Sequence, residues 1–213
     1  MKQTTFHLGF FLTPLIPVII YLRTAGAMYD TYSISIIFGV YAFILVCNQF
    51  YLASQPVWLT KLLGAKTVRA LHGSSPLLIV LLSFVHALLK LSNGFSLSST
   101  QAILGLVAFI LFFVGTMAAL LFFANTLLTK KEPFASFRTK TYARTGMTHQ
   151  KTRAMHNLMV AAGLVVLIHV LRSSTSSFSY NPWGMSILIA WMVFSLLSYL
   201  NYRLKGRTHR GKS

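Results

Sequence analysis

Long apolar runs alternate with short polar segments along almost the whole chain. A transmembrane α-helix needs about 20 predominantly apolar residues to cross the hydrocarbon core of a bilayer. Six runs meet or approach that length, at residues 6–22, 32–52, 69–90, 102–128, 153–172 and 183–202. The pattern predicts an all-α integral membrane protein, with six transmembrane helices forming a single domain over residues 1–213.

Prolines and small residues mark two irregular places in this pattern. Pro76 lies four residues after His72 and cannot donate a backbone hydrogen bond to the His72 carbonyl. Either the third span is kinked there, which we favour, or its helix begins near Ser75 with Pro76 in the first turn. Ala25-Gly26-Ala27 resembles a signal-peptidase site, but the preceding run is long for a signal sequence and Arg23 intervenes. We therefore expect the first span to be retained.

Composition supports the membrane class and excludes several functions. Apolar residues make up 55% of the chain, and the mean hydropathy is +0.65. Asp30 and Glu132 are the only acidic residues, which excludes hydrolytic chemistry based on paired carboxylates. The formal net charge is +17, but the basic residues lie between apolar runs without a nucleic-acid-binding motif, so we expect no nucleic-acid partner. Cys47 is the single cysteine, which excludes a disulfide framework or a thiolate metal site and predicts a packing role.

Lysine and arginine are distributed unevenly between the polar segments. The amino end, the segments after the second and fourth spans and the carboxyl tail hold sixteen of them, whereas the other segments hold only Arg23, Lys90 and Arg172. Because basic residues are retained on the cytoplasmic side, the count predicts a cell-membrane protein with both termini in the cytoplasm. The third and fifth spans then run in the same direction, from the inner to the outer side.

These two parallel spans each carry two histidines. His72 and His86 are fourteen residues apart in the third span, about 21 Å of helix rise, and His156 and His169 are thirteen apart in the fifth. The pairs expected at equal depth are His72 with His156 at the inner side and His86 with His169 at the outer side. A single histidine in a span often serves only as an interhelical hydrogen-bonding group, but two matched pairs are what two stacked haems with bis-histidine axial ligation require.

Basic residues flank the four histidines at helical spacing. Arg69, Arg153, Lys90 and Arg172 lie three or four residues from a histidine, on neighbouring positions of a helix face. They either bind haem propionates or mark the span ends by extending toward the membrane surface. An ideal helix separates His156 and His169 by about 140° around its axis, so either the haems meet the fifth helix at different azimuths or that helix is distorted near Gly163.

The motifs H-x13-H in the third span and H-x12-H in the fifth resemble the transmembrane haem domain of the ferric reductase and NADPH oxidase superfamily. The chain is also similar to the haem membrane subunit of the periplasmic methionine sulfoxide reductase system. The resemblance implies that His72, His86, His156 and His169 ligate the irons of two haem b groups that pass electrons across the membrane. The 213 residues contain no FAD- or NADPH-binding motif. Where the family often has an aromatic residue between the haems, the fifth span has Met159, with Phe84 of the third span as a substitute.

The expected function is electron transfer from a cytoplasmic flavin or flavoprotein to an extracytoplasmic acceptor, which is a ferric chelate, oxygen or a redox protein. The chain would be the haem component of an oxidoreductase, with FMN or FAD supplied by or shared with a partner. The basic loop 129–153 either docks this donor or only sets the topology. Alternatives are a haem-binding membrane anchor subunit and a haem-handling transporter. His7, His149 and His209 are expected to be non-ligands, with His149 the first exception to test.

Overall fold

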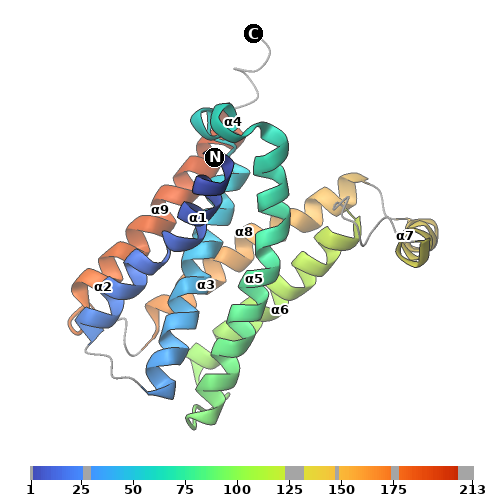
Figure 1. The fold of residues 1–213 in the computed structure, drawn as a ribbon. Coiled ribbons are helices and arrows are strands. Elements are labelled where there is room, and N and C mark those ends of the chain that lie inside the picture. The colour runs from blue at the N-terminus through green and yellow to red at the C-terminus, as the bar shows by residue number, and fades with distance from the viewer. Residues whose placement is uncertain (1, 26–29, 123–131, 147–148, 174–177, 206–213) are drawn as a thin grey trace.

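The computed structural model describes residues 2–25, 30–122, 132–146, 149–173 and 178–205, and these residues form helices without any strand among them (Figure 1). In chain order the helices are α1 (Lys2–Leu12), α2 (Leu15–Ala25), α3 (Thr31–Ala53), α4 (Val57–Leu63), α5 (Ala65–Ser92), α6 (Thr100–Phe122), α7 (Glu132–Thr145), α8 (His149–Leu171) and α9 (Pro182–Lys205). The all-α prediction is confirmed for this part of the chain.

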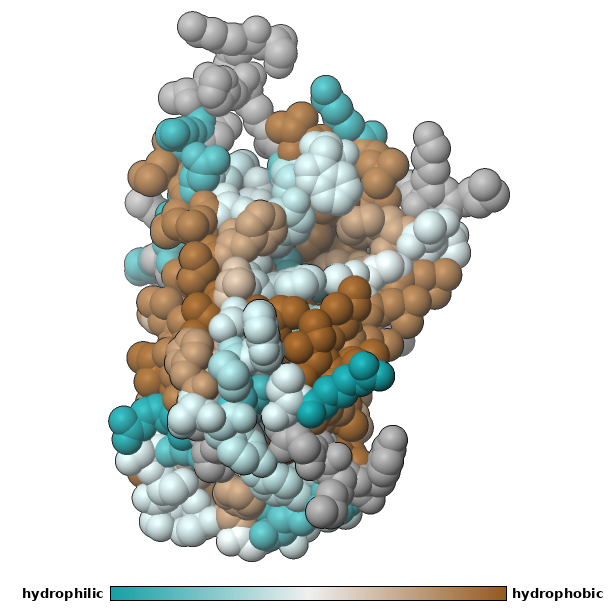
Figure 2. Space-filling view, turned by 90° about the vertical axis from the view of Figure 1, so that its left-hand side faces the viewer, coloured by the Kyte–Doolittle hydropathy of each residue, from teal (hydrophilic) through white to brown (hydrophobic). Residues whose placement is uncertain are grey.

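Five helical segments are long and apolar enough to cross a membrane. They are Thr4–Thr24, which joins α1 and α2, and Thr31–Ala53, Ala65–Ser92, Thr100–Leu121 and Pro182–Lys205. The apolar part of α8 is shorter and runs over His156–Leu171. Figure 2 shows hydrophobic residues over much of the middle of one face, with hydrophilic residues toward its two ends. The membrane character is thus supported, and the crossing of α8 stays a prediction.

The helices form a bundle in which α3 has the central position (Figure 1). It packs against α5 on one side and against α9 and α2 on the other, while α6 packs along α8. Phe43, Ile44 and Leu45 in the middle of α3 are all buried. Cys47 is also fully buried, with its Sγ 3.9 Å from the Sδ of Met192 on α9, as expected for a packing residue.

The start of α1, the helix α4 and the end of α9 lie at the same end of the bundle (Figure 1). The chain therefore runs down through α1 and α2, up through α3, down through α5, up through α6, down through α8 and up through α9. As the sequence predicts, α5 and α8 run in the same direction. This shared direction is what allows histidines at corresponding depths to meet.

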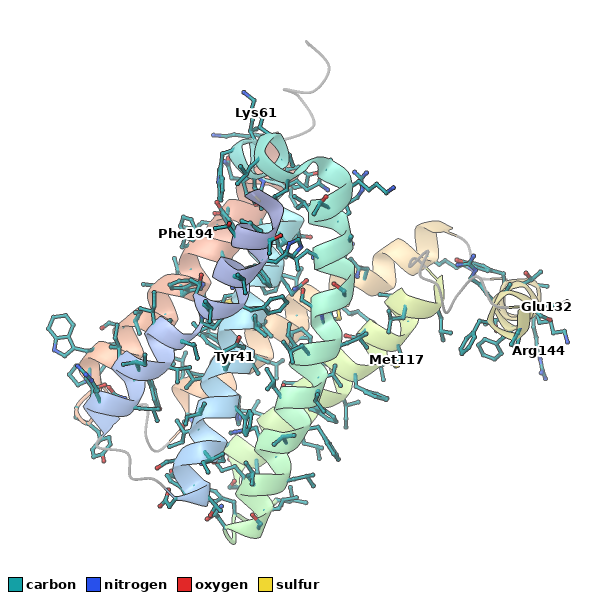
Figure 3. All side chains as sticks on the ribbon, in the orientation of Figure 1. Tyr41, Lys61, Met117, Glu132, Arg144 and Phe194 are labelled. Carbon is teal, nitrogen blue, oxygen red and sulfur yellow. The ribbon has the colours of Figure 1, made fainter. Side chains whose placement is uncertain are left out.

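The first predicted span is broken into two helices at Thr13 and Pro14. Proline lacks a backbone N–H, so Pro14 cannot donate to the Phe10 carbonyl, and the Thr13 carbonyl accepts from the Ile16 N–H at 3.1 Å instead of from Pro17. The Thr13 hydroxyl donates to the Gly9 carbonyl, and the Tyr41 hydroxyl of α3 donates to the Phe11 carbonyl (Figure 3). The break redirects α1, so that α2 packs on α3 and α9 whereas α1 lies against α4.

The structure decides two sequence predictions about helix boundaries. Helix α5 is continuous from Ala65 through Pro76, so the alternative in which it begins near Ser75 is wrong. The segment 129–153, predicted as a loop, holds the helix α7 and the first turn of α8. Helix α7 escaped prediction because it is polar and short, without the apolar period that marks the other helices. Residues 123–131, which include Lys130 and Lys131, lie outside the described parts. So do residues 26–29, which include Gly26 and Ala27 of the Ala25-Gly26-Ala27 motif.

Asn181 fixes the start of α9 and ties it to α2. It is fully buried, its Oδ1 accepts hydrogen bonds from the Gly184 N–H at 3.0 Å and from the Thr24 hydroxyl, and its Nδ2 donates to the Tyr21 carbonyl at 3.3 Å. Losing an N-cap costs about 1 kcal/mol, and orphaned buried partners add to that. We expect Asn181→Ala to lower the melting temperature in detergent by about 4–10 °C. Asn201→Ala, at an exposed position of the same helix, is the control, and equal melting temperatures would refute the role of Asn181.

Candidate functional site

The four histidines predicted as ligands form two pairs between α5 and α8. The ring centroids of His72 and His156 are 5.9 Å apart with an interplanar angle of 86°. Those of His86 and His169 are 6.4 Å apart at 85°. These are the two pairs expected from equal depth, which we call the inner pair (His72 and His156) and the outer pair (His86 and His169). Their role as ligands stays a prediction.

The course of α8 explains how both pairs can form. The helix is continuous from His149 to Leu171, through Gly163. Figure 1 shows α8 running obliquely behind α5 rather than along it. Different faces of α8 therefore approach α5 at the two depths, which accommodates the angular separation of about 140° between His156 and His169 on an ideal helix.

Both outer histidines hydrogen-bond to a backbone carbonyl of a neighbouring helix. The His86 Nδ1 is 2.7 Å from the Ser35 carbonyl oxygen of α3, and the His169 Nδ1 is 2.8 Å from the Gln101 carbonyl oxygen of α6. A carbonyl oxygen can only accept, so each Nδ1 must carry the proton and donate it. In the neutral imidazole the Nε2 then keeps its lone pair. Both outer histidines are held in the tautomer that ligates through Nε2.

A glycine one helical turn after each accepting residue makes room for the ring. A Cβ built on Gly39 would lie 2.8 Å from the Nδ1 and Cε1 of His86. A Cβ built on Gly105 would lie 2.8 Å from the Cε1 of His169. Such contacts are too short for real carbon atoms, so only glycine permits these ring positions. We call the Ser35 carbonyl with Gly39, and the Gln101 carbonyl with Gly105, the two cradles.

A cavity of about 310 Å³ adjoins the outer pair. Its walls come from α3, α5, α6 and α8, and both His86 and His169 line it. Aliphatic and aromatic side chains form most of the remaining wall, among them Phe43, Phe109 and Phe112. An apolar cavity with a few convergent polar groups is the usual form of a cofactor site.

The inner pair has a different environment. The His72 Nδ1 is buried without a hydrogen-bond partner, whereas His156 lies at an exposed position. Near His72 the Gln49 side-chain amide of α3 donates to the Ser75 hydroxyl, and the Gln49 Oε1 is buried without a partner. Among the described glycines, none lies within 4 Å of the His72 or His156 ring as Gly39 and Gly105 do at the outer pair.

The four cations predicted to bind propionates have unequal positions. Lys90 lines the cavity of the outer pair, with its Nζ 3.8 Å from the Tyr32 ring centroid and 4.4 Å from that of Phe95. Arg69 is exposed one turn before His72, and Arg172 is exposed after the end of α8. The side chain of Arg153 lies outside the described part of the chain. Of the three cations whose side chains are described, Lys90 is the one that lines a cavity beside a histidine pair.

Sequence reasoning missed the residues that α3 and α6 contribute. Phe84, predicted as the aromatic residue between the pairs, is 48% exposed and stacks on Phe109 with centroids 6.3 Å apart. Phe43 of α3 is a buried aromatic residue, 2% exposed, one turn beyond Gly39. No signal in the sequence marks Phe43, Gly39 or Gly105, because their roles depend on which helix faces meet.

The imidazole nitrogens of a histidine pair suit a metal ion that is already held by other ligands of its own cofactor. Among the described residues, no group of three or more His, Cys, Asp or Glu side chains converges in a way that could hold a bare ion. Two opposed imidazoles supply only two nitrogens, which is the axial requirement of a haem iron. The outer pair, with fixed tautomers and an adjoining apolar cavity, fits this group.

Comparisons with known proteins add no assignment to this geometry. The described fold and its histidine pairs therefore carry the functional interpretation, together with the spacing of the histidines in the sequence. No protein-family model matches the chain, and neither a curated protein nor a solved structure matches it.

Proposed function

We propose that this protein carries electrons across the cell membrane through two haem b groups, one ligated by each histidine pair. The electrons would enter from a cytoplasmic flavin or flavoprotein and leave to an extracytoplasmic acceptor such as a ferric chelate, oxygen or a redox protein. The observation that carries the proposal is the outer pair. Its two imidazoles have fixed Nδ1–H tautomers, their ring centroids are 6.4 Å apart, and both line an apolar cavity.

The Nδ1–H tautomers of His86 and His169 leave an Nε2 lone pair on each outer imidazole. One metal ion between them would satisfy both. Metal–imidazole bonds of about 2 Å on either side of one ion, added to the radii of the two rings, place the ring centroids about 6 Å apart. The centroid distances of 6.4 Å and 5.9 Å agree with this spacing at both pairs.

A haem with both axial positions filled by histidine would supply one-electron transfer without an open position for substrate. The chain's own residues orient the imidazoles, exclude water from the cavity and place a positive charge at its rim. The cradles fix the outer imidazoles and strengthen them as ligands, because a carbonyl that accepts from Nδ1–H raises the basicity of Nε2. Phe43 and Phe112 exclude water from the cavity, and Lys90 offers a positive charge at its rim for an anionic group.

The proposed conduit spans most of the bilayer. Along α5 the two pairs are separated by fourteen residues, about 21 Å of rise against a hydrocarbon core of about 30 Å. In this proposal α8 is the sixth transmembrane helix, and its polar first turns lie at the inner surface. The excess of basic residues at the end of the bundle where α1 begins and α9 ends supports cytoplasmic termini.

A donor docking site is proposed on the cytoplasmic side. Helix α7 connects α6 to α8 and extends away from the bundle (Figures 1 and 3). It carries Arg138, Lys140 and Arg144 against the single acidic residue Glu132. An acidic or phosphate-bearing donor such as a flavoprotein would be attracted to this helix.

Electron transfer across a sealed membrane tests the proposed function. The haem-loaded protein would be reconstituted into liposomes with dithionite inside and ferricyanide outside. We expect reduction of external ferricyanide well above the rate of protein-free liposomes, because electrons pass between the two sides through the protein. If the two rates were equal while the protein held its haem, transmembrane conduction would be refuted.

The cradles give a prediction specific to the outer pair. Gly39→Ala and Gly105→Ala each place a Cβ where the imidazole ring now lies. We expect both variants to lose or distort the outer haem and to change its electron paramagnetic resonance signal, while the signal of the inner haem stays. Gly73→Ala is the control, because a Cβ there meets no atom within 4 Å. If all three variants kept the wild-type spectrum, the cradles would have no role in ligation.

A further inference from the structure

A second and larger cavity lies on the opposite side of α3 from the histidines. Its volume is about 940 Å³, at the upper end of the range of small-molecule sites. Residues of α1, α3, α4 and α9 line it, and none of the four paired histidines is among them. The break at Thr13 and Pro14 creates it, because α1 turns toward α4 instead of following α2 along α9. Adjacent residues of α3 face the two sides: Gln49 bonds to α5, whereas Asn48 lines this cavity.

Among the residues that the structure describes, none of those lining the cavity is charged. Its lining is mostly aliphatic and aromatic, with the polar residues Thr5, Thr13, Asn48, Tyr51 and Ser195 among them. Lys61, the cation of α4, points away from the bundle at its end (Figure 3). Nothing in the lining would neutralise a phosphate or a carboxylate. The cavity therefore suits an uncharged molecule.

Three polar side chains of the wall each have a hydrogen-bond donor for which the structure shows no acceptor. The Ser195 Oγ is buried without a partner, on a residue that is 1% exposed. The Asn48 Oδ1 accepts from the Trp191 Nε1 at 3.0 Å, which leaves the amide N–H groups of Asn48. The Tyr51 hydroxyl oxygen accepts from the Trp58 Nε1 at 2.8 Å, which leaves its own proton. Donors without acceptors are complementary to a carbonyl or ester oxygen.

We propose that this cavity binds an uncharged lipid that carries a carbonyl or ester oxygen on a hydrocarbon chain. The oxygen accepts hydrogen bonds from Ser195, Asn48 or Tyr51, and the chain packs against Trp58, Trp191 and the other apolar residues of the wall. A neutral glyceride and an isoprenoid quinone share this chemistry. The site is independent of what the histidine pairs bind.

The tryptophans of the chain provide a built-in reporter. Trp58 and Trp191 line the cavity, whereas Trp183 is 73% exposed at the start of α9 and does not. A Trp183→Phe variant therefore reports on the cavity, and a Trp58→Phe/Trp191→Phe variant reports on the lipid around the protein. The ratio of fluorescence with and without a quencher cancels any constant quenching by a bound cofactor.

Gly9 offers a way to fill the cavity without disturbing the fold. It lines the cavity, and a Cβ added there meets no atom within 4 Å. Gly9→Phe would occupy the space of the lipid, whereas Leu8→Phe changes an exposed neighbour on the same helix that does not line the cavity. The two variants form a matched pair.

The experiment uses the full chain in nanodiscs of bromine-free phosphatidylcholine, titrated with a diacylglycerol brominated on its acyl chains or with a decyl-substituted benzoquinone. We expect saturable quenching of the Trp183→Phe variant by at least one probe, weakened about tenfold by Gly9→Phe and unchanged by Leu8→Phe. Quenching by the brominated glyceride identifies a glyceride, and quenching only by the benzoquinone identifies a quinone. Quenching that is non-saturable, equal for brominated phosphatidylcholine and unaffected by Gly9→Phe would reflect surrounding lipid only and would overturn the proposal.

Discussion

Replacing His86 by alanine is expected to remove one of two haems and to abolish electron transfer across the membrane. The ring centroids of the two outer imidazoles are 6.4 Å apart. A haem held by both imidazoles would therefore lose one of its two ligands when His86 is replaced. The inner pair lies about 21 Å away along α5 and keeps both of its ligands. Haem quantified per chain should fall to about half of the wild-type value, and ferricyanide reduction by internal dithionite should fall to the rate of protein-free liposomes.

His169→Ala should give the same result as His86→Ala, because the two residues belong to one pair. His7→Ala is the control, since His7 lies on α1 and away from both pairs, and it should keep the full haem content. The double variant His86→Ala/His169→Ala should lose no more haem than either single variant. A double variant without any haem would contradict the pairing, because it would mean that His86 and His169 ligate different irons.

Reversing the charge of α7 is expected to slow reduction by the physiological donor by about tenfold or more. Arg138, Lys140 and Arg144 make α7 a cationic helix, and their replacement by glutamate would repel an acidic donor. The wild-type rate should also fall as salt rises, because the Debye length shrinks to about 8 Å at physiological ionic strength. Stopped-flow spectroscopy of the haem bands measures both effects. Reduction by dithionite should be unchanged, since a small reductant needs no docking surface.

Glutamine variants of the same three residues separate electrostatic steering from loss of the helix, because they should give an intermediate rate. Arg203→Glu/Lys205→Glu tests the other described cationic segment, at the end of α9. Full donor-linked reduction by the α7 variant, with both haems bound, would show that the basic segment only sets the topology. A loss confined to the α9 variant would move the entry site to the carboxyl end.

The helices and the pairing of the histidines could be predicted because both follow from periodic and directional rules. Apolar runs of transmembrane length fixed the positions of α3, α5 and α9 to within a few residues. The distribution of lysine and arginine gave α5 and α8 the same direction. With a common direction, equal depth was sufficient to pair His72 with His156 and His86 with His169.

The cradles could not be predicted because they depend on contacts between helices that are distant in sequence. Gly39 and Gly105 look like ordinary small residues of apolar helices, and their roles appear only when α3 meets His86 and α6 meets His169. The same holds for Phe43, which is buried and lines the cavity of the outer pair, whereas Phe84 is 48% exposed. The cavity lined by Ser195 arises from the direction of α1. Pro14 in the sequence indicates that the helix breaks there, but it does not specify the direction that α1 takes.

The haem content of the purified protein tests the central claim most directly. The chain would be produced in haem-replete cells, purified in mild detergent and analysed by pyridine haemochrome assay and by reduced-minus-oxidised spectroscopy. Two bis-histidine sites predict about two haems b per chain, both low-spin in the oxidised and reduced states. A folded, haem-free protein from such cells would contradict the account.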